Sequence, residues 1–108
     1  MTESSAPASR EFATFRDFYP YYLSEHTNTV SRRLHVLGTG LVLLTAVVAL
    51  ASGNAEWLWL LPLLGYGPAW IGHFFFEKNR PATFRHPLYS LAGDFVMFRD
   101  VLLGRIRW

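Results

Sequence analysis

The chain has 108 residues, of which 51% are hydrophobic and 17% aromatic, and its formal net charge is +2. This length predicts one domain. The low net charge and the absence of any polybasic tract argue against a protein that binds nucleic acid. The chain has no cysteine, so disulfides, thiolate metal sites and cysteine nucleophiles are excluded. Any bound metal would need nitrogen and oxygen ligands.

The N-terminal residues 1–9 are small and polar, which predicts a disordered tail before a single membrane helical domain over residues 10–108. Residues 11–25 follow with aromatic and aliphatic side chains at helical spacing, which predicts an amphipathic helix of the kind that lies in a membrane interface. These side chains are Phe12, Phe15, Phe18, Tyr19, Tyr22 and Leu23.

Two apolar runs come next, and we expect helices over residues 29–52 and 55–78. The stretches 35–52 and 57–76 contain no Asp, Glu, Lys or Arg, and each approaches the roughly 20 residues that cross about 30 Å of hydrocarbon. The turn 53–56 joins them, and Pro62 and Pro68 are expected to bend the second helix. The pattern predicts a transmembrane hairpin. The alternative is a compact soluble bundle with unusually apolar central helices.

Residues 79–87 predict a loop because Pro81 and Pro87 interrupt helix formation. Residues 88–103 predict a fourth helix, which Gly104 would end. The expected fold class is therefore all-α, an integral membrane helical hairpin with two transmembrane helices. Two amphipathic helices flank this hairpin in a four-helix unit.

The ten basic residues give the expected orientation. All of them lie outside the turn between the two apolar runs, whose only charge is Glu56. By the positive-inside rule, both termini and the histidines would then face the cytoplasm. We expect an integral protein of a bacterial-type inner membrane or an equivalent membrane. Its basic side chains would meet lipid headgroups or an acidic lipid substrate.

The four histidines are the candidate functional residues. His35 lies 18 residues before Gly53 and His73 lies 17 residues after Glu56, so both would sit about 26–27 Å from the turn, at one mouth of the hairpin. His26 and His86 flank the same mouth. This placement predicts a metal site at a membrane surface. The alternative reading of each histidine alone is an interfacial polar group or a helix cap.

Small residues recur beside His35 and His73, which predicts close helix approach and lets the two histidines face each other. Glu77 shares a helix face with His73 and would be a further ligand or an acid–base group. Alternatively, Glu77 pairs at the surface with Lys78 or Arg80. Asp94 would orient a ligand histidine, or would simply be a helix-surface charge.

The donor types are compatible with iron, zinc, copper, manganese or nickel. Histidines with a carboxylate and open positions suit non-haem Fe(II) and O₂ chemistry. The motifs of hydrolase elbows, zinc proteases, P-loops and dinucleotide-binding folds are absent from the sequence.

Two segments resemble a known family. They are FYPYYLSEHTNTVSRRLHVLGT, residues 18–39, and YGPAWIGHFFFEKNRPATFRHPLYSLAGDFVMF, residues 66–98. They contain a YLxxH motif, a second histidine nine residues later and a GHxxFEKNRPA block. On these motifs the chain is similar to the Mpo-type 2-hydroxy fatty acid dioxygenase family of small membrane proteins.

The resemblance implies an Fe(II)-dependent enzyme of fatty acid α-oxidation, which uses O₂ to shorten a 2-hydroxy fatty acid by one carbon. The family's motif histidines match His26, His35 and His73, which would hold the iron. His86 is a weaker match and a possible fourth ligand, and Glu77 lies in the FEK block. The chain has Ser31 where the family often has asparagine, a change that could alter the hydrogen bonds around the ligands.

Within this reading, the substrate carboxylate would be attracted by one or more of the arginines at headgroup level, Arg32, Arg33 and Arg80. Two other functions are compatible with the same residues. One is a non-catalytic membrane scaffold or assembly protein with interfacial histidines. The other is a haem-binding hairpin with His35 and His73 as axial ligands. A four-helix unit this small could also form a homodimer.

Overall fold

The computed structural model describes residues 12–108, and the predicted tail at residues 1–9 lies outside them. All regular secondary structure in the described range is helical, which agrees with the all-α expectation. The four α-helices are α1 (Phe15–Ser24), α2 (Thr29–Ser52), α3 (Leu61–Ile71) and α4 (Pro87–Leu102). Three short helical segments accompany them: the 3-10 helices η2 (Ala55–Leu60) and η4 (Ala82–Phe84), and the π-helix η3 (Gly72–Glu77).

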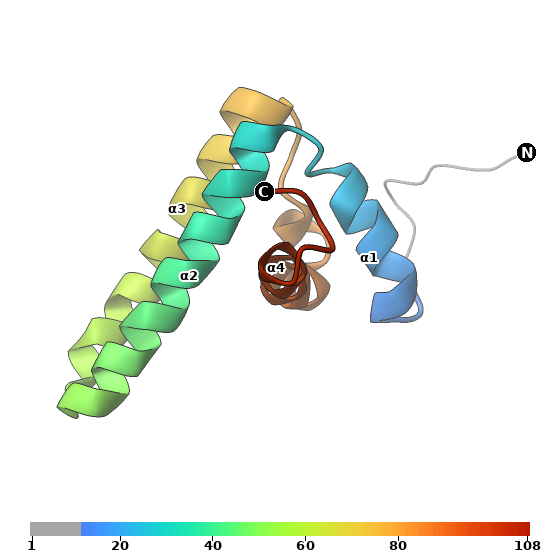
Figure 1. Cartoon of the computed structure of the whole chain (residues 1–108). Helices are drawn as coiled ribbons and strands as arrows, with labels where there is room; N and C mark the ends of the chain where they lie inside the picture. Colours follow the sequence, from blue (N-terminus) through green and yellow to red (C-terminus); the bar gives the residue numbers. More distant parts are fainter. Residues whose placement is uncertain (1–11) are drawn as a thin grey trace, which may run out of the picture.

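Helices α2 and α3 form a long antiparallel hairpin (Figure 1). Helix α2 has the predicted bounds because its ends are capped: the side chain of Asn28 accepts a hydrogen bond from the Ser31 N–H, and Gly53 ends the helix in the left-handed conformation, with φ of 69°. Asn54 then caps η2 by accepting a hydrogen bond from the Glu56 N–H.

The prediction of a single helix over residues 55–78, bent at Pro62 and Pro68, is wrong. The segment divides into η2, α3 and η3. Pro62 lies in the first turn of α3, where its missing N–H breaks no α-helical hydrogen bond, whereas a continuous α-helix would require that donor. At the other end of the arm, α3 stops at Ile71 and the π-helix η3 begins, so that His73 lies in the π-helix.

The two arms of the hairpin touch at glycines. A Cβ atom on Gly38 would lie 2.9 Å from the Leu64 carbonyl oxygen, and one on Gly72 would lie 2.7 Å from Ser31 Oγ. Neither position has space for a side chain. These approaches hold the histidine-bearing faces of α2 and the α3–η3 arm against each other, as the small-residue pattern predicted.

Only α2, among the described residues, is long and apolar enough to be a candidate membrane span. The two-span hairpin is therefore not confirmed, because α3 has 11 residues and ends where the π-helix begins. Both arms nevertheless expose large apolar side chains near the turn. These include Leu43, Leu44, Val47, Leu50, Trp59 and Leu63.

Helix α4 packs against α2, and α1 packs against the other side of α4 (Figure 1). The buried core comprises Phe18, Tyr22, Val36, Ala82 and Met97. Helix α1 is amphipathic as predicted, but it spans 15–24 and begins at a cap in which Thr14 Oγ1 accepts from the Asp17 N–H. Gly93 of α4 lies directly against the Tyr22 ring, where a Cβ atom would come within 2.7 Å.

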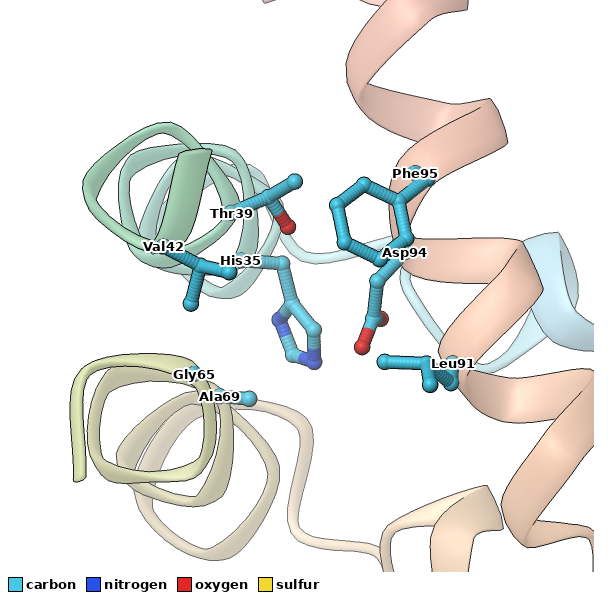
Figure 2. Close-up of a pocket in the computed structure, with 8 residues that line it drawn as sticks. All are labelled: His35, Thr39, Val42, Gly65, Ala69, Leu91, Asp94 and Phe95. Atoms are coloured by element: carbon cyan, nitrogen blue, oxygen red, sulfur yellow. The ribbon is translucent and has the colours of Figure 1, made fainter. Parts of the chain in front are cut away.

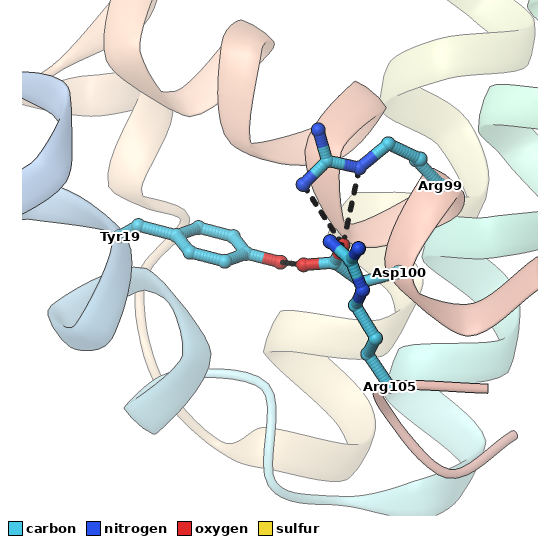
Figure 3. Close-up of polar contacts among 4 residues, drawn as sticks. All are labelled: Tyr19, Arg99, Asp100 and Arg105. Atoms are coloured by element: carbon cyan, nitrogen blue, oxygen red, sulfur yellow. Dashed lines mark hydrogen bonds and ion pairs between the residues drawn. The ribbon is translucent and has the colours of Figure 1, made fainter. Parts of the chain in front are cut away.

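Asp100 joins α1, α4 and the C-terminal segment (Figure 3). Its carboxylate accepts a hydrogen bond of 2.8 Å from the Tyr19 hydroxyl and bonds of 2.9 and 3.1 Å from Arg99. Arg105 lies 3.7 Å from the same carboxylate. Burial raises the pKa of Asp100, but the hydrogen bonds from Tyr19 and Arg99 and the charges of Arg99 and Arg105 lower it further, so the net shift is downward.

Candidate metal centre

Three imidazole rings converge at the end of the hairpin away from the turn. His26 comes from the connection between α1 and α2, His35 from α2, and His73 from the π-helix η3. The Nε2 atom of His35 lies 3.0 Å from Nε2 of His26 and 3.1 Å from Nε2 of His73. All three side chains are buried, with exposed fractions of 4% or less. The structure thus brings together three of the four predicted histidine ligands in one group that could hold a metal ion.

Each ring is held through its other nitrogen. The Nδ1 atom lies 2.6 Å from the Tyr22 carbonyl oxygen in His26, 2.8 Å from the Ser31 carbonyl oxygen in His35, and 2.7 Å from Asn79 Oδ1 in His73. Carbonyl oxygens only accept hydrogen bonds, so each neutral ring carries its proton on Nδ1. The three Nε2 lone pairs are therefore all free and face one another.

The spacing of the three Nε2 atoms is compatible with a bound metal ion. Two nitrogens bound side by side to one octahedral ion at about 2.1 Å lie about 3.0 Å apart, close to the two Nε2 distances given above. Without a cation, facing lone pairs at this distance repel. Protonation does not relieve that repulsion, because burial and the neighbouring His35 and His73 rings lower the pKa of His26 well below its usual value. Nitrogen-only donors of this kind suit iron, zinc, copper or nickel.

The π-helix positions His73. Its last residue, Glu77, is followed by Lys78 in the left-handed conformation, with φ of 62°, and the Asn79 N–H then bonds back to the His73 carbonyl oxygen at 3.0 Å. The Asn79 side-chain amide donates to Glu25 Oε1 and to the Glu25 carbonyl oxygen, each at 3.2 Å. Because these bonds use the NH₂ group, the amide oxygen is turned toward His73. π-Helical turns are frequent at functional sites.

A second chain of contacts positions His26. The Tyr22 ring stacks on the His26 ring, with centroids 4.1 Å apart and planes 26° apart. The Tyr22 hydroxyl donates to Asp94 Oδ1 on α4. Asp94 was predicted to orient a ligand histidine, and the structure connects it to His26 through Tyr22. Residue-by-residue reading missed Tyr22 and Asn79 as supporting residues, although both lie inside the YLxxH and FEKNRPA motifs.

A small cavity adjoins the histidines between α2, α3 and α4. Its volume is about 30 Å³, and Figure 2 shows the His35 ring and the Asp94 carboxylate directed into it. Its walls are otherwise mainly apolar, formed by Thr39, Val42, Gly65, Ala69, Leu91 and Phe95. A second cavity of about 10 Å³ is lined by His35, His73 and Asp94 among others. Spaces of this size hold one or two water-sized molecules.

Asp94 is the carboxylate residue that lines both cavities. Burial raises the pKa of Asp94 to about 6, against the opposing effect of the hydrogen bond from Tyr22. Its carboxyl group can therefore exchange a proton near neutral pH. A carboxyl group with a pKa near the working pH is suited to general acid–base catalysis.

His86 does not join the cluster, which corrects the prediction of a fourth ligand at this mouth. It precedes α4, and its ring packs at centroid distances of 5.2 Å from Phe12 and 5.4 Å from Phe18. Glu77 also lies outside the metal-ligand group: its Oε2 accepts a bond of 2.9 Å from the Asn28 N–H at the start of α2. It therefore ties η3 to α2. In the described part of the chain, Glu77 forms no ion pair with Lys78 or Arg80.

Of the remaining predicted residues, two contact the clustered histidines and two do not. Ser31 is fully buried and its carbonyl oxygen orients His35, whereas its Oγ has no hydrogen-bond partner. Arg32 donates to the His26 carbonyl oxygen at 3.1 Å and to the Arg107 carbonyl oxygen at 2.8 Å. The guanidinium of Arg33 lies over the Trp108 ring, 5.4 Å from its centroid. Arg80 is exposed.

Comparison with known proteins gives one family. A family model described as 2-hydroxy-palmitic acid dioxygenase Mpo1-like matches residues 12–106. No curated protein and no solved structure matches the chain significantly. The matched range includes all three clustered histidines together with Tyr22, Asn79 and Asp94.

Proposed function

The chain belongs to the 2-hydroxy-palmitic acid dioxygenase Mpo1-like family, and from this premise we propose that it is an Fe(II)-dependent dioxygenase. Its substrates would be O₂ and a 2-hydroxy fatty acid, which it would shorten by one carbon. The family match carries the reaction class, and the site geometry supports a metal-dependent mechanism.

The observation that carries the proposal is the convergence of the three Nε2 lone pairs. His26, His35 and His73 each donate through Nδ1 to a carbonyl oxygen, which leaves three buried nitrogen donors, with that of His35 3.0 and 3.1 Å from the other two. Iron held there would serve as Lewis acid and redox centre for the oxygenation of a 2-hydroxy acid. The neutral ligands keep the positive charge of the ion available to an anionic substrate.

Other residues would bind and orient the substrate. Arg32 is anchored to the His26 carbonyl oxygen, which keeps one guanidinium beside the cluster, where it would attract the substrate carboxylate. Asp94 would accept or return the proton of the 2-hydroxyl group through the carboxylate oxygen not bonded to Tyr22. The apolar side chains around the cavity would exclude bulk water from this region.

We further propose that the enzyme works at a membrane surface. Helix α2 is a candidate span, and the apolar side chains exposed on the η2–α3 arm favour insertion of that arm beside it. The basic residues outside the turn favour a cytoplasmic position for the termini and the histidines. A fatty acid in the same membrane would present its polar head at this level.

The haem alternative does not fit the distances. Two axial histidine nitrogens on opposite faces of a porphyrin lie about 4 Å apart, with the macrocycle between them. The His35 and His73 nitrogens are 3.1 Å apart, and the His26 nitrogen is 3.0 Å from that of His35. There is no room for a macrocycle among the three rings.

The first test is elemental analysis of protein purified in detergent under anaerobic conditions. We expect near-stoichiometric iron in the unmodified chain and its loss in His35→Ala and His73→Ala. His86→Ala is the matched control and should retain iron, because that ring lies among Phe12 and Phe18.

The second test is O₂ consumption by the iron-loaded protein with a 2-hydroxy fatty acid and with the unsubstituted acid of equal length. Turnover of the hydroxy acid alone supports the proposal. No metal after Fe(II) loading would favour the scaffold reading. If the protein contains zinc that iron cannot replace, the metal site is supported and the oxygenase function is excluded.

A further inference from the structure

We propose that the outer surface between α2 and α4 binds one anionic phospholipid of the bilayer, with its acyl chain in an apolar groove and its headgroup against arginines. The groove has a volume of about 560 Å³. Its main walls are Leu37, Leu41, Leu44, Phe98, Leu102 and Trp108. None of the three clustered histidines lines it, so this site is separate from the candidate metal centre.

The floor of the groove follows one face of α2. Leu37, Leu41 and Leu44 lie four, eight and eleven residues after Arg33, so all four side chains share a helix face. The distance from Arg33 to Leu44 along the helix is about 16 Å, close to half of the roughly 30 Å hydrocarbon thickness. The length of this face therefore matches the thickness of one leaflet. Arg33 lies at one end, and the three leucines that follow it form an apolar surface about as long as an acyl chain.

The end of the groove nearest Arg33 is cationic, and its side chains are held in place by contacts with the C-terminal segment. Arg32 holds the C-terminal segment through its bond to the Arg107 carbonyl oxygen, and Arg33 lies over the ring of Trp108, itself a wall residue. In the described part of the chain, the only carboxylate in ion pairs here is Asp100, which binds Arg99 and Arg105. Arg33 and Arg107 are exposed and form no ion pair there.

The charge and the shape of this surface favour one occupant. The exposed Arg33, which forms no ion pair, favours an anion, and the three leucines that follow it on α2 favour a hydrocarbon chain. A bilayer phospholipid with an anionic headgroup has both parts at this separation. The inference rests on α2 contacting lipid, which is part of the proposed function, but it requires neither iron nor oxygenase activity.

Native mass spectrometry of the detergent-purified protein tests this. Phosphatidylglycerol and phosphatidylcholine with identical acyl chains are titrated separately. We expect one phosphatidylglycerol to bind at least about fivefold more tightly than phosphatidylcholine, the difference that one arginine near an anionic headgroup supplies. Arg33→Gln should abolish the preference for phosphatidylglycerol. Leu41→Trp should weaken the binding of both lipids, because the larger side chain fills the groove.

Arg16→Gln is the matched control, because Arg16 is also exposed but lies on α1. It should leave the preference unchanged. Equal affinity for the two lipids, an unaltered preference in Arg33→Gln, or an equal loss in Arg16→Gln would overturn the inference. So would displacement of the phospholipid by an equimolar 2-hydroxy fatty acid, or a lipid-free dimer whose formation Leu41→Trp abolishes. Each of these results leaves the iron measurements intact, so the two proposals fail separately.

Discussion

His35 and His73 are 38 residues apart in the chain, and their Nε2 atoms lie 3.1 Å apart. The contact joins α2 to the π-helix that follows α3, and it lies beside the close approach of Ser31 and Gly72. Packing of the hairpin arms therefore assembles the candidate metal centre directly. Changes in that packing should alter metal binding even where no ligand is changed.

Asn79→Ala should weaken metal binding by about 10–100-fold, the usual effect of removing the hydrogen-bond partner of a ligand histidine. The His73 ring would lose the acceptor that holds its proton on Nδ1. A competition titration of the metal against a chelator measures this. Asn54→Ala is the control, because Asn54 caps η2 at the far end of the hairpin. Equal affinity of the Asn79→Ala and unmodified proteins would contradict the assigned role.

Gly72→Ala should reduce the free energy of unfolding by about 1–3 kcal/mol, because the added Cβ overpacks against Ser31. That atom would lie 2.7 Å from Ser31 Oγ and 3.1 Å from Ser31 Cα. Gly67→Ala is the control, since its Cβ would meet Leu63 at an ordinary 4.0 Å, and alanine favours a helix over glycine. Thermal unfolding in detergent compares the two, and a Gly72 variant as stable as the Gly67 variant would refute the close packing.

Asp94→Asn should change how stability depends on pH. Burial raises the pKa of Asp94 from 3.8 to about 6 in the folded protein, so the folded state binds the proton more tightly than the unfolded state. The resulting stabilisation is complete below about pH 3.8 and is lost as the pH rises through 6. The variant should therefore gain stability relative to the unmodified protein between pH 4 and 7, by at most about 3 kcal/mol.

Thermal unfolding of both proteins across this range measures that difference. A constant difference would contradict the raised pKa. The asparagine oxygen can still accept the Tyr22 hydroxyl, so the variant tests the charge and keeps a partner for Tyr22.

Tyr19→Phe should destabilise the protein by about 1–2 kcal/mol, because Asp100 is buried and would lose a hydrogen bond of 2.8 Å that joins α1 to α4. Arg105→Gln should cost less than about 0.5 kcal/mol, since the Arg105 side chain is 65% exposed and its ion pair is 3.7 Å long. Denaturant unfolding of both variants ranks them. The reverse order would show that the ion pair dominates this junction.

Much of the fold could be predicted because its signals are local. The bounds of α2 were predicted correctly, since an asparagine before the helix and a glycine after it determine where hydrogen bonding begins and ends. The pairing of the two arms followed from the short turn. The prediction of a single third helix failed because Pro62 cannot donate the hydrogen bond that an α-helix running through it would need, and α3 therefore begins just before this proline.

The candidate site divides in the same way. Counting residues from the turn at a uniform helical rise predicted that His35 and His73 lie at one level. Their rings do meet, although the second arm is divided into 3-10, α and π segments. The same reasoning predicted a similar position for His86, which instead packs against Phe12 and Phe18. Distance from the hairpin mouth says little about a loop histidine, because its direction depends on the aromatic core.

The sequence by itself determined the helical hairpin, the nitrogen and oxygen chemistry of any metal site, and the family. It could do so because residue type, periodicity and motif spacing are properties of the chain alone. Only the tertiary structure decided that His86 lies apart from the other three histidines and which ring nitrogen of each of those three is free. Those depend on carbonyl oxygens and on Asn79, Tyr22 and Asp94, contributed by separate segments. A hydrogen bond requires its donor and acceptor atoms to lie within about 3 Å of each other. For atoms from separate segments of the chain, only tertiary packing achieves this.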